Sequence, residues 1–90
     1  MDKKKLEQLR EKLEMVHKWP IVYLFKFIVT SEVEKIKAIK TMFDESAEIT
    51  SKESKNGNYT SLSIKMMVMK SDEVFDRYLE ASKIEGVISL

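Results

Sequence analysis

Residues 21–30 alternate between apolar odd positions and a mixed set of even positions. The odd positions carry Ile, Tyr, Phe, Phe and Val, whereas the even positions include Lys26 and Thr30. A period of two is typical of a β-strand, and the β-branched and aromatic side chains favour the same assignment. We therefore predict a strand whose odd positions face the core. Its other face would carry Val22, Leu24 and Ile28, more apolar surface than a freely solvated face usually shows.

A β-hairpin is predicted for residues 47–70, centred on Asn56-Gly57. Asn-Gly favours a two-residue type I′ turn because both residues tolerate positive φ. Such a turn fixes the pairing of strands 47–54 and 58–70, so that apolar residues share one face and hydroxyl and charged residues share the other. The predicted pairs are Ala47 with Met66, Ile49 with Ile64, Glu48 with Lys65, Thr50 with Ser63 and Lys52 with Ser61. The inward-facing residues of the second strand would be Leu62, Ile64, Met66 and Val68.

The chain begins with a charged segment, residues 2–16, that carries one narrow apolar stripe. Apolar residues three and four positions apart are typical of an amphipathic helix. The helix should end before Pro20, which restricts Trp19 to an extended conformation. His17, the one histidine, then lies in a linker. The stripe consists of Leu6, Leu9, Leu13 and Val16 and should cover a sheet or a partner.

Two further helices are predicted from the same periodicity. Ser31 and Glu34 have the spacing of a capping box, which would start a helix that ends near Asp44. Ser71-Asp72 would cap the other helix, and Gly86 separates it from a short final strand, residues 87–90. The buried residues of the two helices would be Val33, Ile36, Ile39 and Phe43 in the first, and Val74, Phe75, Tyr78 and Leu79 in the second.

The predicted elements follow the order helix, then strand, helix, strand, strand, helix, strand. A βαββαβ chain of this length fits an α+β, ferredoxin-like sandwich, with a four-stranded antiparallel sheet and both main helices on one face. The first and third strands would be central, although an α+β fold with another strand order remains the alternative. Residues 1–18 would form an extra amphipathic helix and linker, and residues 19–90 a single domain.

Composition narrows the classes of function. The chain has 90 residues, with 16 basic and 15 acidic side chains, so the total charge gives no sign of nucleic-acid binding. It contains no cysteine, which rules out a disulfide or thiolate metal site. The longest unbroken apolar run, residues 21–25, is far shorter than the roughly 20 residues of a membrane span. We expect a soluble cytoplasmic protein without a cofactor, and we read the lysines at positions 3–5 as a solvated helix start.

No catalytic constellation stands out in the sequence. The same fold can support phosphate chemistry, but this requires an arginine on a phosphate-binding loop. Arg10 and Arg77 are the arginines of the chain, and both fall on predicted helices. The paired carboxylates Glu45/Glu48 and Asp72/Glu73 lie near helix ends, where acidic residues ordinarily cap or are solvated. We therefore predict a protein that is not an enzyme.

Several strings resemble the YbeD-like family of small bacterial proteins of unknown function. These are Trp19-Pro20 followed by residues 23–26, the run SKNGNYTSLSI at residues 54–64, and Tyr78 before an apolar end. The resemblance implies a ferredoxin-like fold related to the regulatory ACT domains, and no established enzymatic activity. Val29-Thr30 stands where the family often has glycine, which argues against an ACT-like amino-acid site.

We therefore interpret the chain as a regulatory or protein-interaction module that acts through the open face of its sheet. Its partner would be a second copy or another protein, with no role for a membrane. The alternatives are an RNA-binding ferredoxin-like domain, for which the third strand offers one aromatic residue, and an ACT-like small-ligand sensor. The other alternative is that the N-terminal helix simply covers this face. The predicted interaction patch comprises Val22, Leu24, Lys26, Ile28, Tyr59, Ser61, Ser63, Lys65 and Met67, with Met69 at its border.

Overall fold

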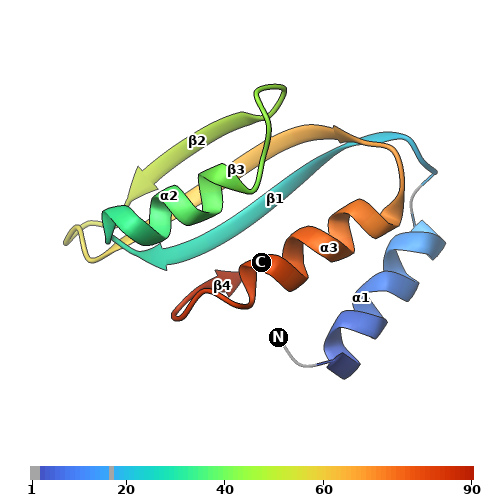
Figure 1. The fold of residues 1–90 in the computed structure, drawn as a ribbon, viewed down its shortest axis with the longest axis horizontal. Coiled ribbons are helices and arrows are strands. Elements are labelled where there is room, and N and C mark those ends of the chain that lie inside the picture. The colour runs from blue at the N-terminus through green and yellow to red at the C-terminus, as the bar shows by residue number, and fades with distance from the viewer. Residues whose placement is uncertain (1–2, 17) are drawn as a thin grey trace.

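The structure is a computed structural model that describes residues 3–16 and 18–90, so the expectation for His17 lies outside the described residues. The elements follow the predicted order (Figure 1). They are α1 (Lys3–Val16), β1 (Ile21–Thr30), α2 (Val33–Thr41), β2 (Glu48–Glu53), β3 (Tyr59–Val68), α3 (Ser71–Ala81) and β4 (Ile88–Ser89).

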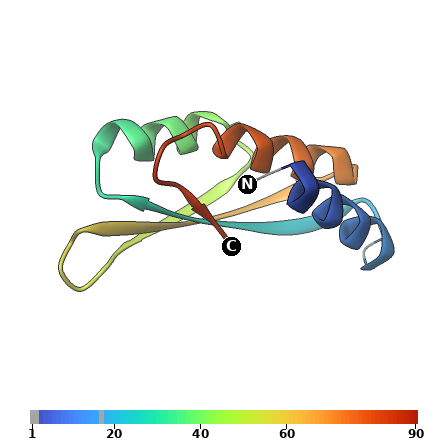
Figure 2. The ribbon, with the colours of Figure 1, turned by 90° about the horizontal axis from the view of Figure 1, so that it is seen from below.

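The sheet has the strand order β2-β3-β1-β4, and every neighbouring pair is antiparallel. β1 pairs with β3 along its whole length, from Ile21 opposite Val68 to Thr30 opposite Tyr59. Figure 2 shows α2 and α3 over the same face of this sheet. The predicted ferredoxin-like sandwich with β1 and β3 at its centre is confirmed.

The hairpin has the predicted register but not the predicted turn. Ile49 lies opposite Ile64 and Glu48 opposite Lys65, as expected, although β2 begins after Ala47. Gly57 has φ of +74°, whereas no non-glycine residue in the described ranges has a positive φ, so Asn56 cannot occupy a type I′ turn. The Ser54 N–H donates to the Tyr59 carbonyl at 2.8 Å, so the pairing extends one residue beyond β2 and leaves a four-residue loop, residues 55–58. Within it the Gly57 N–H donates to the Ser54 carbonyl at 2.9 Å. This longer loop keeps the register because it has the same centre.

The core lies between the helices and the inner face of the sheet. Phe25 and Phe27 from β1 are fully buried, and the Phe25 ring meets Phe43 edge-on at 5.1 Å. Burial raises the pKa of Tyr78, whose hydroxyl donates to the Leu90 carbonyl at 3.1 Å. The buried apolar residues include Leu13, Phe25, Phe27, Val29, Ile39, Phe43, Leu62, Ile64, Val68, Val74, Tyr78 and Ala81. The predicted inward parity of both central strands is therefore correct.

Two residues predicted as buried are exposed. Val33 is 80% exposed because it is the first residue of α2 and precedes the turn that packs on the sheet. Leu79 is 38% exposed, since the buried stripe of α3 runs through Tyr78 and Ala81 and leaves Leu79 at its flank.

The predicted helix caps are also wrong, because tertiary contacts engage the capping side chains. The Ser31 hydroxyl shares a hydrogen bond of 2.8 Å with the Thr60 hydroxyl, and Glu32, not Ser31, is the N-cap of α2. The hydrogen bond from the Thr30 hydroxyl, together with Lys35, lowers the pKa of Glu32.

α3 likewise begins without a side-chain cap. Its N-cap is Lys70, and the predicted capping residue Ser71 donates its hydroxyl to Glu14 of α1. The Glu73 carboxylate reaches back to accept the Met69 N–H at 2.7 Å. The carboxylates predicted to lie at this helix end are therefore in structural contacts.

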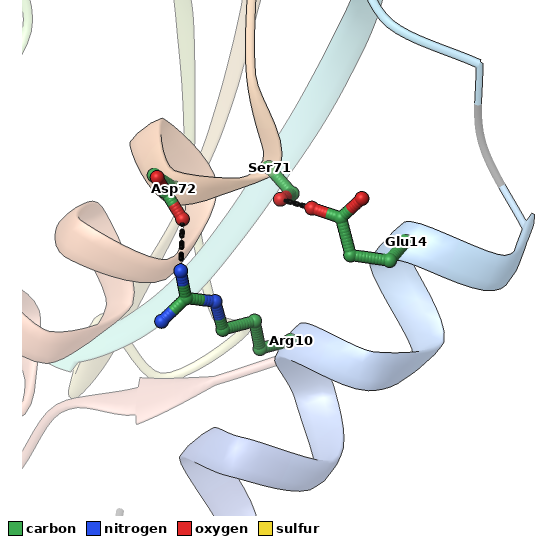
Figure 3. Close-up of polar contacts among 4 residues, drawn as sticks. All are labelled: Arg10, Glu14, Ser71 and Asp72. Atoms are coloured by element: carbon green, nitrogen blue, oxygen red, sulfur yellow. Dashed lines mark hydrogen bonds and ion pairs between the residues drawn. The ribbon is translucent and has the colours of Figure 1, made fainter.

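α1 packs beside α3 and runs obliquely, from the level of α3 at its N-terminal end to the level of the strands at its other end (Figures 1 and 2). Leu13 is only 4% exposed and joins the core, and Leu9 packs against it. Figure 3 shows two polar contacts between the helices, from Arg10 to Asp72 at 2.7 Å and from Ser71 to Glu14. Whether this helix covers the open sheet face was left open by the sequence, and in the structure it packs against α3 instead.

The turn can be tested by comparing Gly57→Val with Asn56→Ala. A side chain on Gly57 finds only ordinary van der Waals contact, so the cost comes from a strained positive φ. We expect Gly57→Val to lower the free energy of unfolding by about 1–3 kcal/mol, measured by urea denaturation. Asn56→Ala should change it little, because Asn56 does not have a positive φ. A larger loss for Asn56→Ala would contradict this geometry.

The parity of β3 can be tested with two neighbouring residues. Ile64 is fully buried and Ser63 is partly exposed on the other face. Ile64→Ala should cost about 2–5 kcal/mol as a cavity mutation, and Ser63→Ala much less, by chemical denaturation. The reverse ranking would mean that the assignment of faces is wrong.

The docking of α1 can be tested with Leu13→Ala and Met15→Ala. Leu13 is buried whereas Met15 is 85% exposed on the same helix. We expect Leu13→Ala to lower the free energy of unfolding by about 2–5 kcal/mol and Met15→Ala to change it by no more than roughly 0.5 kcal/mol. Equal unfolding midpoints for the two variants would show that α1 contributes no packing to the domain.

Candidate interaction face

The even-numbered residues of β1 and the odd-numbered residues of β3 define the open face of the sheet, opposite α2 and α3. The register pairs them in cross-strand rows. Because alternate residues of a strand point to the same side, all nine residues of the interaction patch lie on this face. The rows are Val22–Met67, Leu24–Lys65, Lys26–Ser63, Ile28–Ser61 and Thr30–Tyr59. The structure thus brings the patch residues together, while their role stays a prediction.

One end of the open face is apolar and uncovered. Val22 is 53% exposed, Leu24 50% and Met67 54%, and the neighbouring Met69 is 57% exposed. Val22 lies directly opposite Met67, so these side chains form one surface. α1 packs against α3, and these side chains stay about half exposed, so no helix in the described part of the chain covers them.

The middle of the open face carries basic side chains. Lys26 and Lys65 lie in adjacent rows and are diagonal neighbours on the central strands, and both are exposed. β2 adds Glu48 opposite Lys65 and Lys52 opposite Ser61. Three lysines and one glutamate therefore occupy these paired positions, which gives this part of the face a net positive charge.

The other end of the face contains a hollow of about 340 Å³ beside Tyr59, which is 49% exposed. Ile28 forms part of its wall and pairs on its other side with Ile88 of β4, which is 52% exposed. The residues that line the hollow are Ile28, Lys52, Glu53, Ser54, Tyr59 and Ser61. The basic middle of the face is thus flanked by apolar surface on both sides.

Two apolar residues near Lys26 were not predicted to belong to this region. Ile88 shares the open face because it pairs with Ile28. The Leu90 N–H donates to the Lys26 carbonyl at 2.9 Å, which places exposed Leu90 beside that lysine. No turn links β4 to β1, so the sequence offers no signal for their register.

The two arginines weighed for catalysis, and the carboxylates Asp72 and Glu73, are in structural contacts elsewhere. Arg10 pairs with Asp72, and its guanidinium lies 5.6 Å from the centre of the Phe75 ring. Arg77 lies 5.4 Å from the centre of the Phe43 ring. Within residues 3–16 and 18–90, no group of three or more His, Asp or Glu side chains could hold a metal ion.

A larger hollow, of about 440 Å³, lies away from the interaction patch. It is formed by α2 and the end of α3 and has a mixed polar and apolar wall, with Glu80 and Lys83 beside Met42 and Ile84. Neighbouring Asp44 accepts hydrogen bonds from the hydroxyl and N–H of Ser46, which lower its pKa. These contacts stabilise the connection between α2 and β2.

These features define a small α+β domain with a ferredoxin-like sandwich and an exposed apolar sheet face crossed by lysines. Residues 14–90 match the family described as "Protein of unknown function (DUF493)", and the chain belongs to that family. This is the YbeD-like family, so the resemblance seen in the sequence is confirmed.

A solved structure supports the fold. The solution structure of protein HP0495 from H. pylori is similar with a TM-score of 0.65 and 19% sequence identity, over 83% of this chain and 86% of that chain. At this identity the likeness shows the fold alone. No curated protein matches the chain. None of the helices in the described ranges is both long and apolar enough to cross a lipid bilayer.

Proposed function

We propose that this protein is a small non-catalytic module that binds another protein through the open face of its sheet and acts in regulation. The observation that carries the proposal is the uncovered surface of Val22, Leu24 and Met67. Contiguous apolar surface of this kind usually marks a contact site on a folded domain. The helix that could have covered it packs against α3 instead.

The patch has the composition of a docking surface. Covering a half-exposed Val, Leu or Met side chain contributes on the order of 1 kcal/mol each. Methionine adds an adaptable surface, since its flexible thioether can fit differently shaped partners. Lys26 and Lys65 at the centre would provide orientation and selectivity.

Protein binding accounts for this face better than the two alternatives. An RNA-binding sheet stacks bases on several aromatic rings, whereas the interaction patch contains only Tyr59. In an ACT-like sensor, the backbone at the end of β1 would have to approach the bound ligand closely. There Val29 is buried and Ser31 is hydrogen-bonded to Thr60.

We place the protein in the cytoplasm in this proposal. Its chain contains no cysteine, so it does not depend on an oxidising compartment to form disulfides. The absence of catalysis is proposed because Arg10 and Arg77 are engaged with Asp72 and the Phe43 ring. Neither arginine lies on the interaction patch.

The proposal can be tested by partner capture with wild-type protein, Leu24→Asp and Val33→Asp. Both substitutions place a carboxylate on an exposed apolar residue, but Val33 lies at the start of α2, away from the open face. We expect a specific partner to be retained by the wild type and by Val33→Asp. Its recovery with Leu24→Asp should fall at least about tenfold, because a buried unpaired charge is costly. Equal capture by both variants would refute the use of this face.

A further inference from the structure

The charge pattern of the open face indicates the chemistry of its partner. Lys26 lies between Leu24 and Ile28 along β1, and Leu90 is held beside it by the bond to the Lys26 carbonyl. On β3 the adjacent row holds Lys65. A partner that covers the apolar residues must also cover these ammonium groups. Burying them without a counter-charge is unfavourable, so the partner should carry a carboxylate at this point.

The spacing of the rows indicates the conformation of the partner. Side chains on one face of a strand are two residues apart, about 7 Å, so the rows of Leu24, Lys26 and Ile28 span about 14 Å. Positions i, i+4 and i+8 of an α-helix lie about 6 and 12 Å apart along its axis, which is close to that spacing. A segment lying flat on a sheet face finds no backbone partners there. A helix satisfies its own N–H and C=O groups and suits this contact.

We propose that the open face binds an acidic amphipathic helix of a partner protein. Its carboxylate would meet Lys26 and Lys65, and apolar side chains about four residues to either side would cover Leu24 and fill the hollow beside Tyr59. This inference rests on the proposed function and specifies the partner that it leaves open. Lys26 would be the residue that determines selectivity.

A second copy of the chain fits the face less well. Two open faces packed about a two-fold axis through the middle rows would bring Lys26 and Lys65 of both copies together. Like charges brought together in an interface oppose association. Glu48 is the one acidic residue in the paired rows, and it lies on the edge strand.

The test is a selection of random eighteen-residue peptides displayed on phage, carried out on the immobilised full-length chain. Enriched peptides are synthesised, and their affinities are measured for the wild type, Lys26→Glu, Lys26→Gln, Leu24→Asp and the control Val33→Asp. The urea midpoint of each variant establishes that it is folded. We expect enriched peptides with Asp or Glu about four positions from apolar residues. Lys26→Glu should lower the affinity for these peptides about tenfold or more, and Lys26→Gln should lower it less.

Charge exchange makes the test specific. Replacing the peptide carboxylate by lysine should restore binding to Lys26→Glu and reduce binding to the wild type. Enriched peptides that are neutral or basic and bind Lys26→Glu as tightly as the wild type overturn the acidic partner. In that case the docking face still stands if Leu24→Asp abolishes binding.

Four other outcomes overturn the inference. Peptides that bind Leu24→Asp as tightly as the wild type refute the proposed function as well, because the face is then not used. A concentration-dependent dimer that Leu24→Asp disrupts assigns the face to a second copy. Displacement of the peptides by a short single-stranded RNA, or a selection without enrichment, also contradicts an acidic helix.

Discussion

The fold depends on the pairing of β1 with β3. These strands are both ten residues long and pair from end to end, so a single register fixes the side of every residue. With a period of two, a shift by one residue would turn Phe25 toward solvent and Lys26 toward the helices. The helices and the short β4 then attach to surfaces that this pairing has already defined.

Much of this pairing could be predicted from the sequence. The alternation along β1 gave the correct faces, and the hairpin centre gave the correct partner for Ile64, even though the turn type was wrong. Register follows from the centre of the loop and the parity of the strands. A two-residue and a four-residue loop with the same centre therefore lead to the same pairs. The backbone conformation inside the loop does not change this register.

The errors concern residues whose partners are distant in sequence. Ser31 has the spacing of a capping residue, but Thr60 offers its hydroxyl at 2.8 Å, and Ser71 donates to Glu14 of α1. The candidate interaction face shows the same difference between local patterns and contacts distant in sequence. The alternation of residues along β1 and β3 correctly predicted which residues share the open face. The apolar stripe of α1 could not indicate whether Leu13 would pack on that face or beside α3. A stripe specifies an apolar neighbour without specifying which one, and Ile88 was missed because nothing local aligns β4 with β1.

The last residue is held on two sides, since the Leu90 N–H donates to Lys26 and its carbonyl accepts the Tyr78 hydroxyl. This arrangement has a practical consequence for any protein fused to the chain. A fusion joined after Leu90 begins beside Lys26, next to the interaction patch, and would compete with a partner for the same space. The N-terminal end of α1 lies on the helical side of the sheet (Figure 2), so an attachment there leaves the open face accessible.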